Sequence, residues 1–338
     1  MLKKYLNTLL LDFWLVPFVN ISFSRLTLPL YVFCNVNRIL AKTRLVYWLF
    51  PVALLFSGWH LEKDMLLFWA FIRPLFFGVV FFHIGMLMSS RDFGSILRNY
   101  VLLAILANTI LYVITPAPEA RLSLFKLFNF AAIQGDLNLI REGRWILPSG
   151  NPARLGFVVG LALVFFSSQR VHLKSLASFI SVLMSGARSA LFGIVVVFLR
   201  RNLKVLLLSS VLIYPLVLFL ISLDLRVFNF SEESLLRHFL LRERTLECIS
   251  RWSMMDWIFG VGIGQSEHYI MGSYSFTVLL TIVFETGLLG LLSFLAFFTR
   301  RILLNPIGIY LFSVMLLYEV KPDPFFWLSL GFIKVKTI

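Results

Sequence analysis

Residues 183–191 read Leu183-Met184-Ser185-Gly186-Ala187-Arg188-Ser189-Ala190-Leu191, with long and mostly apolar runs on both sides. A guanidinium in the middle of an apolar run is costly to bury. Either a buried site needs the charge of Arg188, or the chain turns there and brings the side chain to a surface. The choice between these two structures decides how the neighbouring helices are arranged.

The composition of the chain indicates an integral membrane protein. Hydrophobic residues make up 59% of it, charged residues make up 14%, and the mean hydropathy is +0.88. Long apolar runs are separated by short polar ones, and a segment inside lipid must satisfy its backbone polar groups internally, as a helix does. We therefore predict an all-α, polytopic fold in which residues 1–338 form a single transmembrane domain in the lipid bilayer.

The charge of the chain favours a topology with both termini on the inner side of the membrane. The formal net charge is +14, which in a soluble protein would suggest a polyanionic partner such as nucleic acid. When the N-terminus is placed inside, the inner segments carry many Lys and Arg residues and a single acid, Asp92, whereas the outer segments are nearly neutral. This asymmetry follows the positive-inside rule, so we expect no nucleic-acid partner.

The apolar runs predict about twelve membrane crossings, with about ten as the lower limit, and the shorter runs must be tilted or broken because a full span needs about 20 residues. The predicted crossings are 5–19, 21–35, 45–60, 65–88, 100–115, 153–169, 174–187, 188–200, 203–223, 276–299, 302–319 and 323–335. Two outer loops, 116–152 and 224–275, are much longer than the other connections. Loops of that length are typical of lids or sites over a rigid scaffold.

The second long loop contains two amphipathic patterns. Ser231–Ser234 precedes a run of apolar residues at helical spacing, and residues 243–258 repeat that spacing. We predict helices that lie on the membrane surface, with Trp252 and Trp257 at headgroup depth. The same pattern would also suit a folded cap that does no chemistry.

Two topologies compete for the stretch around Arg188. A single helix would place the basic clusters that begin at Arg170 and Arg200 on opposite faces of the membrane, whereas a helix pair turning near Ser185–Ser189 keeps both inside. Each half of the pair would be about 20 Å long, against a bilayer core of about 30 Å. We therefore predict a sunken turn, with Arg188 at the base of a cavity open to the outside and beside a helix N-terminus. In the single-helix alternative Arg188 would snorkel or pair with Glu285.

Four stretches, taken together, are similar to the motifs of a known superfamily. Ser185-Gly186-Ala187-Arg188-Ser189-Ala190-Leu191 resembles the Ser-x-Ser-Arg-x-Ala-Leu signature of the O-antigen polymerases and O-antigen ligases. Gly143-Arg144 followed by Asn151-Pro152 resembles that superfamily's Gly-Arg and Pro-Asn segment, with Asn and Pro in reversed order. Arg251 followed by Gly260-Val261-Gly262-Ile263-Gly264 resembles its arginine helix and glycine turn. Glu285-Thr286-Gly287-Leu288-Leu289-Gly290-Leu291 resembles its Glu-x-Gly-x-x-Gly helix.

One departure from the pattern favours a polymerase over a ligase. Ligases of this superfamily usually carry a histidine just before the Glu-x-Gly helix. Here that region reads Gly272-Ser273-Tyr274-Ser275-Phe276-Thr277, and the nearest histidine is His268.

The resemblance implies a reaction, a location and a set of partners. It implies polymerisation of oligosaccharide repeat units, carried on undecaprenyl diphosphate, for O-antigen, capsule or exopolysaccharide. The location would be the outer face of a bacterial inner membrane, with both long loops in the periplasm and both termini in the cytoplasm. An acceptor hydroxyl would attack the reducing-end sugar, and the lipid diphosphate would leave. A chain-length regulator and a flippase would be further partners.

Such a glycosyl transfer needs a positive clamp on the leaving diphosphate. Arginine suits this role because its planar fork binds phosphate oxygens bidentately and never loses its proton. The candidates for the clamp are Arg188, Arg144 and Arg251, followed by Arg141 and Arg244. Arg141 with Glu142, and Arg244 with Glu247, could instead form ordinary solvated ion pairs.

The sequence offers three candidates for the base that takes the proton of the acceptor hydroxyl. Glu267 and His268 lie beside the glycine turn, and His238 lies in the same loop. Each could serve if it came within hydrogen-bond reach, although a lone loop histidine is more often structural. Glu285, inside an apolar run, is expected to pair with an intramembrane arginine.

The acids, histidines and cysteines show no metal-ligand spacing, so we predict a metal-independent reaction without a cofactor, in which arginines stabilise the developing charge. Two other functions remain open. The first is an O-antigen ligase that moves finished glycan to an outer acceptor lipid. The second is a polysaccharide transporter or flippase, although transporters usually show repeated halves and a site at the midplane.

Overall fold

The computed structural model describes only part of the chain, and all structural statements below refer to that part. The described residues are 15–16, 21–22, 32, 37, 45–57, 78–115, 117, 119–120, 145–148, 152–199, 243–244, 246–262, 278–316 and 323–335. Their regular structure is helical apart from one pair of two-residue strands. The all-α prediction is therefore confirmed at this coarse level.

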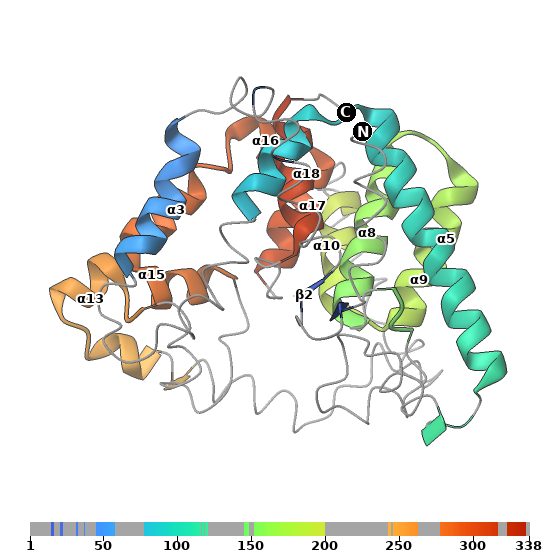
Figure 1. Cartoon of the computed structure of the whole chain (residues 1–338), viewed down its shortest axis with the longest axis horizontal. Coiled ribbons are helices and arrows are strands. Elements are labelled where there is room, and N and C mark those ends of the chain that lie inside the picture. The colour runs from blue at the N-terminus through green and yellow to red at the C-terminus, as the bar shows by residue number, and fades with distance from the viewer. Residues whose placement is uncertain are drawn as a thin grey trace.

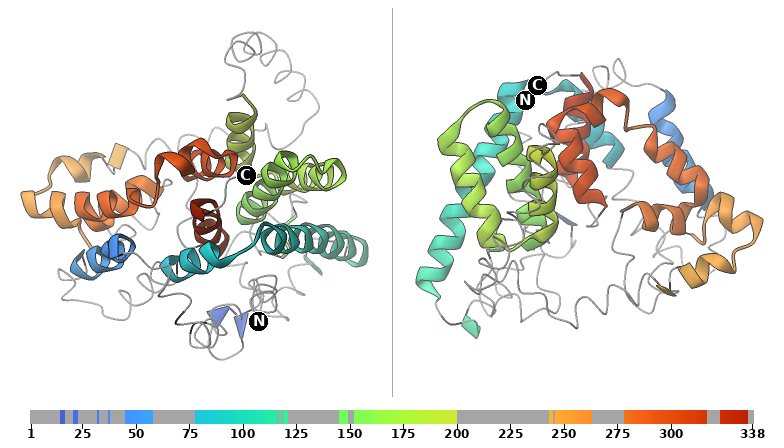
Figure 2. Two further views of the ribbon diagram at one scale, coloured as in Figure 1. Left: turned by 90° about the horizontal axis from the view of Figure 1, so that it is seen from above. Right: turned by 180° about the vertical axis from the view of Figure 1, so that it is seen from behind.

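The helices form two groups with a central layer between them. The elements are β1 (Leu15–Val16), β2 (Ile21–Ser22), α3 (Leu45–Ser57), a helix over Gly78–Leu87, α5 (Ser90–Ile114), α8 (Pro152–Ser168), α9 (His172–Ser185), α10 (Arg188–Leu199), α13 (Met254–Phe259), α15 (Val278–Leu295), α16 (Arg300–Leu304), α17 (Pro306–Met315) and α18 (Pro324–Val335). Figures 1 and 2 show α5, α8, α9 and α10 on one side and α3, α13 and α15 on the other. Helices α17 and α18 lie between the two groups (Figure 1).

The two strands replace helix at the start of the chain. Helices were predicted over 5–19 and 21–35, but Leu15 pairs with Ser22 and Val16 pairs with Ile21 in an antiparallel ladder. Val16 precedes a proline, which pushes a residue out of the helical region towards extended backbone, and Val and Ile both favour strands. Most of these two predicted crossings, and all of 203–223, lie outside the described residues.

Helix α5 begins well before the crossing predicted over 100–115. The side chain of Ser89 accepts a hydrogen bond from the backbone N–H of Asp92 at 3.1 Å, and the two residues form a capping box that starts the helix. Arg91 and Arg98 made this segment look like an inner loop. Its buried positions, Phe93, Ile96, Leu97, Tyr100 and Val101, nevertheless follow helical spacing.

Two predicted helices are each divided by a capping residue. The crossing predicted over 302–319 breaks at Asn305, whose side-chain oxygen accepts a hydrogen bond from the N–H of Ile307 at 3.0 Å and so starts α17. The helix predicted over 243–258 breaks before α13, where Ser253 and Asp256 form a capping box. In both places a polar residue that starts a helix offers the backbone an alternative to continuing the previous one.

Glycines allow the central helices to pack closely. Tyr310 of α17 occupies a notch between Gly160 of α8 and Gly193 of α10, where any added Cβ would collide with its ring, and its hydroxyl donates to the carbonyl of Phe157 at 2.8 Å. Gly85 and Gly331 bring the Gly78–Leu87 helix and α18 into backbone contact. Small residues that permit such close approach are typical of helix packing in membranes.

Helix α9 buries polar side chains and exposes apolar ones. Its serines Ser178, Ser181 and Ser185 are buried, whereas Leu173 and Leu176 are 79% and 55% exposed. Each buried serine hydroxyl donates a hydrogen bond to a carbonyl of its own helix, so each of these buried donors is satisfied. A soluble helix would place the apolar face inward.

Helix α5 is the only described helix that is long and apolar enough to span a membrane by length and composition. Only 33% of its most apolar window is buried, and Leu102, Leu106 and Ile110 of that helix are at least half exposed. The other described apolar helices are shorter.

Candidate functional site

The chain turns immediately before Arg188. Helix α9 ends at Ser185, Gly186 adopts the left-handed conformation with φ 63° and ψ 23°, and α10 begins at Arg188. The turn is tied by hydrogen bonds from Gly186 N to the carbonyl of Leu183 at 3.1 Å and from the N–H of Ala187 to Ser185 Oγ at 3.3 Å. The predicted helix pair is confirmed. We call Ser185–Arg188 the α9–α10 turn.

An irregular segment, Trp145–Leu147, is fixed against the α9–α10 turn. The N–H of Trp145 donates to the carbonyl of Met184 at 3.0 Å, which satisfies one of the acceptors left open at the end of α9. The buried amide of Asn108 holds the next two residues: its oxygen accepts from Ile146 N at 2.9 Å and Leu147 N at 3.1 Å. Its nitrogen donates to the carbonyl of Leu147 at 2.7 Å. Buried irregular backbone requires such internal partners.

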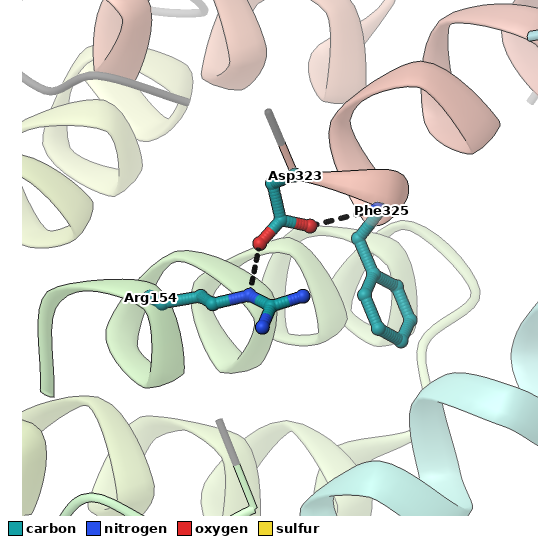
Figure 3. A network of polar contacts seen from close by, with 3 residues as sticks. All are labelled: Arg154, Asp323 and Phe325. Carbon is teal, nitrogen blue, oxygen red and sulfur yellow. Dashed lines mark hydrogen bonds and ion pairs between the residues drawn. The ribbon is translucent and has the colours of Figure 1, made fainter. Parts of the chain in front are cut away.

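The beginnings of α8 and α18 lie at the same end of the bundle. Gly156, in the first turns of α8, lies so close to Ser185 and Ala187 that a Cβ there would overlap both side chains. Arg154, half a turn earlier, donates through Nε to Asp323 Oδ2 at 2.5 Å, and Asp323 Oδ1 accepts from the N–H of Phe325 at 2.8 Å (Figure 3). Asp323 therefore both caps α18 and binds α18 to α8.

This arrangement gathers positive potential at one end of the molecule. Helices α8, α10 and α18 all begin there, and a helix N-terminus carries roughly half a positive charge. Arg188 is half-buried at the first position of α10. Arg154 is 22% exposed and is partly neutralised by Asp323, which is 6% exposed. Among the described residues, the charged groups gathered here are therefore two arginines and one acid, Asp323, beside three helix N-termini, an arrangement that favours an anion.

A second junction joins two of the sequence motifs. The N–H groups of Val261 and Gly262 donate to the carbonyls of Phe284 and Glu285 at 2.9 and 3.1 Å. Those carbonyls are available because Gly287, with φ 63° and ψ −164°, divides α15 into two helical segments. A Cβ added at Gly260 would collide with the backbone of Glu285 and Thr286, and one added at Gly287 would collide with the backbone of Ile258 and Gly260. We call residues Gly260–Gly262 and Glu285–Gly287 the glycine clasp.

Arg251 and Arg244 lie on exposed helical segments ahead of α13. Arg251 Nη2 donates to Glu247 Oε1 at 2.6 Å, in a pair whose side chains are 75% and 60% exposed. The alternative weighed for Arg244 was an ion pair with Glu247, and the structure shows that the carboxylate of Glu247 accepts from Arg251, one helical turn later. Arg251 lies three residues before α13, and α13 lies across α17 from α10 (Figures 1 and 2), so the segment that leads into α13 is separated from the α9–α10 turn.

The remaining predicted site residues lie outside the described residues: Arg144, Arg141, Glu267, His268 and His238. Arg144 directly precedes Trp145, whose backbone is hydrogen-bonded to the α9–α10 turn. The side chain of Glu285 is 1% exposed within the glycine clasp. In the described part of the chain no three His, Cys, Asp or Glu side chains are grouped as a metal ion would require.

Sequence reasoning missed Asn108, Arg154 and Asp323 as parts of this site. The sequence could have indicated Asn108, because it is an amide inside an otherwise apolar run. It could also have indicated Asp323, because an Asp before Pro324 is a pattern that starts a helix. No sequence pattern indicates Arg154, because its partner Asp323 is 169 residues away along the chain.

No protein-family model matches this chain, and no curated protein or solved structure matches it either. The resemblance to O-antigen polymerases and ligases therefore rests on the four sequence motifs. The structure places two of them, the glycine turn and the Glu-Thr-Gly segment, in direct contact. It places the Arg188 motif at a helix–helix turn.

Proposed function

We propose that this protein is a multi-pass membrane glycosyltransferase that polymerises oligosaccharide repeat units carried on undecaprenyl diphosphate. It would have about ten to twelve crossings of the bacterial inner membrane, both termini in the cytoplasm and both long loops, 116–152 and 224–275, in the periplasm. The observation that carries the proposal is the α9–α10 turn, which puts Arg188 at a helix N-terminus and at the end of α9 opposite Lys174.

The membrane placement is supported by the exposure of apolar side chains on the outer helices. Leu102 and Leu106 of α5, Leu173 of α9 and Phe198 of α10 are all at least half exposed. Soluble monomers rarely expose apolar surface on several neighbouring helices. Lipid chains would cover these faces without any cost in exposed polar backbone.

The direction of the helices across the membrane is supported by the distribution of bases. Arg91 and Arg98 near the start of α5, and Arg170 and Lys174 near the start of α9, lie at one end of the bundle. The α9–α10 turn lies at the other end of α9. Because basic residues favour the cytoplasmic side, the turn would face the periplasm.

The turn would also be sunken. Helix α9 has 14 residues and α10 has 12. At 1.5 Å per residue these lengths are about 21 and 18 Å, less than the bilayer core of about 30 Å. Arg188 would then lie below the outer surface, where a charge–charge contact with a diphosphate is screened less than in bulk water.

The chemistry assigned to this site is a transfer between two lipid-linked glycans. A hydroxyl of the acceptor attacks the anomeric carbon of the reducing-end sugar, a glycosidic bond forms, and the bond from that carbon to the diphosphate oxygen breaks. Arg188 binds the departing diphosphate, with Arg144 as the next candidate from the sequence, because arginine pairs bidentately with phosphate oxygens. Glu267, His268 or His238 would take the proton of the hydroxyl. We propose that no metal takes part, since guanidinium groups can carry the charge stabilisation.

The test is to delete the gene in its own organism and separate the lipid-linked glycans on a gel. The proposal expects the long-chain ladder to disappear while single repeat units still reach their acceptor. Complete loss of surface attachment, with chains still polymerised on the carrier, would show a ligase instead. Repeat units that accumulate on the inner leaflet would show a transporter.

The topology can be tested separately with single cysteines in a chain whose Cys34 and Cys248 are replaced by serine. A membrane-impermeant thiol reagent added outside should label Ser189→Cys and leave His172→Cys unlabelled. His172 is the matched control because it is exposed at the opposite end of α9. Labelling of His172→Cys alone would invert the topology and contradict the proposal.

A further inference from the structure

A basic pocket opens at the end of the bundle opposite the α9–α10 turn. It has a volume of about 660 Å³ and lies where the start of α5, the end of α8 and the start of α9 meet. Its charged lining consists of three bases, Arg91, Arg98 and Lys174, and one acid, Asp92. None of these residues has a part in the glycan transfer proposed above.

The single acid of the pocket is already engaged. Asp92 Oδ2 accepts hydrogen bonds from Ser89 Oγ at 2.6 Å and from the N–H of Ser89 at 3.4 Å, as the capping box of α5. Arg98 donates through Nε and Nη2 to the neutral amide oxygen of Asn99, and the ammonium of Lys174 lies 5.5 Å from the ring centre of Phe166. The pocket therefore keeps an excess of positive charge, to which the N-terminus of the 25-residue helix α5 adds.

The surface beside the pocket is apolar. Leu173 and Leu176 flank Lys174 on α9 and are 79% and 55% exposed, and Leu102, one turn after Arg98 on α5, is 50% exposed. The pocket itself includes Phe165, Phe166 and Val171. A ligand that suits both features carries a phosphate at one end and apolar chains at the other.

We propose that this pocket binds the phosphate headgroup of an anionic phospholipid from the cytoplasmic leaflet, with the acyl chains along α5 and α9. Basic pockets between membrane helices on the cytoplasmic side favour such headgroups, each base near the surface adding to the attraction. The lipid would join the first turns of α5 and α9 and so stabilise the bundle whose other end forms the α9–α10 turn. This inference rests on the proposed membrane placement but not on glycan transfer.

The experiment uses the purified full-length chain in neutral detergent, with bound lipids counted by native mass spectrometry. Phosphatidylglycerol should bind at least tenfold more tightly than phosphatidylcholine with the same acyl chains. Arg98→Gln and Lys174→Gln should each weaken phosphatidylglycerol binding about fivefold, and the double variant about 25-fold if the two charges act independently. Arg170→Gln is the matched control: Arg170 is exposed at the same end of α8 but does not line the pocket, so binding should stay within about twofold of wild type.

Two results would overturn the inference. If Arg170→Gln weakens binding as much as Arg98→Gln, the attraction is diffuse and there is no site. If millimolar inorganic phosphate displaces phosphatidylglycerol fully, the pocket is a site for free phosphate. Should the double variant fail to fold, the single variants and the phosphate competition decide the question. A chain that binds the lipid selectively yet does not polymerise glycan would refute the transferase and support this inference.

Discussion

The α9–α10 turn and the glycine clasp both interrupt helices at a glycine with φ 63°, yet the two interruptions differ in what they leave exposed. At the turn, Gly186 ends one helix and the next begins with a half-buried arginine. In the clasp, the carbonyls of Phe284 and Glu285 are filled by the N–H groups of Val261 and Gly262. The break at the turn is followed by a positively charged side chain. The break in the clasp has two of its carbonyls bonded to the facing segment.

The difference separates two roles among motifs that resemble one superfamily. In the clasp two carbonyls of the break accept hydrogen bonds from the facing segment, which holds α13 against α15, so we interpret it as scaffold. The turn combines helix N-termini with Arg188 and Arg154, so we interpret it as the binding end. Motifs that resemble those of one superfamily can therefore differ in role. The packing around each motif indicates whether it supports the fold or forms a binding site.

The largest effect should come from replacing the two glycines of equal φ with asparagine. Asparagine tolerates the left-handed helical region, which Gly186 occupies with ψ 23°. Gly287 has ψ −164°, a region accessible essentially to glycine alone, and a Cβ there would collide with the backbone of Ile258. Gly287→Asn should cost about 3 kcal/mol or more, and Gly186→Asn about 1 kcal/mol or less. Fluorescence-detected size-exclusion chromatography of the detergent-extracted chain should show the larger destabilisation as a lower fraction of monodisperse protein for Gly287→Asn than for Gly186→Asn. Equal yields from both variants would remove the distinction between turn and clasp.

The next effect concerns the support of the α9–α10 turn. Asn108→Leu leaves the N–H groups of Ile146 and Leu147 without their acceptor in a buried place. The expected loss is roughly 2–4 kcal/mol, measured as a lower midpoint of thermal unfolding in detergent. Asn99→Leu is the control, because Asn99 lies on the same helix and accepts only from the exposed Arg98 among the bonds seen here. If both variants unfold alike, Asn108 is not what fixes the irregular segment.

A smaller effect is expected at the ion pair that joins α8 and α18. Arg154→Leu leaves the buried carboxylate of Asp323 without its cation and should cost about 2 kcal/mol. Asp323→Asn keeps the cap on Phe325 and removes the charge, so the double variant Arg154→Leu/Asp323→Asn should recover part of that loss. Thermal unfolding of the four proteins gives the coupling. Strict additivity of the two single changes would show that the pair contributes no coupling energy.

Local sequence patterns predicted the helices well where the decisive signal was local. The positions of bases around Arg188 predicted the turn, and in the structure α10 begins at the expected residue, while α9 ends two residues before the expected one. The start of α5 was missed because Arg91 and Arg98 suggested a loop, whereas the Ser89–Asp92 capping box and the buried apolar stripe continue the helix. Strands at Leu15–Val16 and Ile21–Ser22 were missed because apolar runs were read by length alone.

The site was less predictable because its contacts cross long stretches of sequence. Asn108 reaches residues 146 and 147, and Arg154 reaches Asp323, separations of 38, 39 and 169 residues that no local pattern encodes. The grouping of Arg188 with Arg251 in one clamp came from motif order. Packing places α13 and α10 on opposite sides of α17 (Figure 1).

The most direct test of the central claim is the amount of polymer made by Arg188 variants in cells that lack the native gene, normalised to the amount of protein in the membrane. Arg188→Ala and Arg188→Lys should lower polymer by about 10²-fold or more at normal protein abundance, because a point charge cannot replace a bidentate fork. Arg251→Ala, which removes an exposed pair with Glu247, should have a much smaller effect and cost about 0.5 kcal/mol or less in stability. Normal polymer from Arg188→Ala would contradict the account and return this arginine to a structural role.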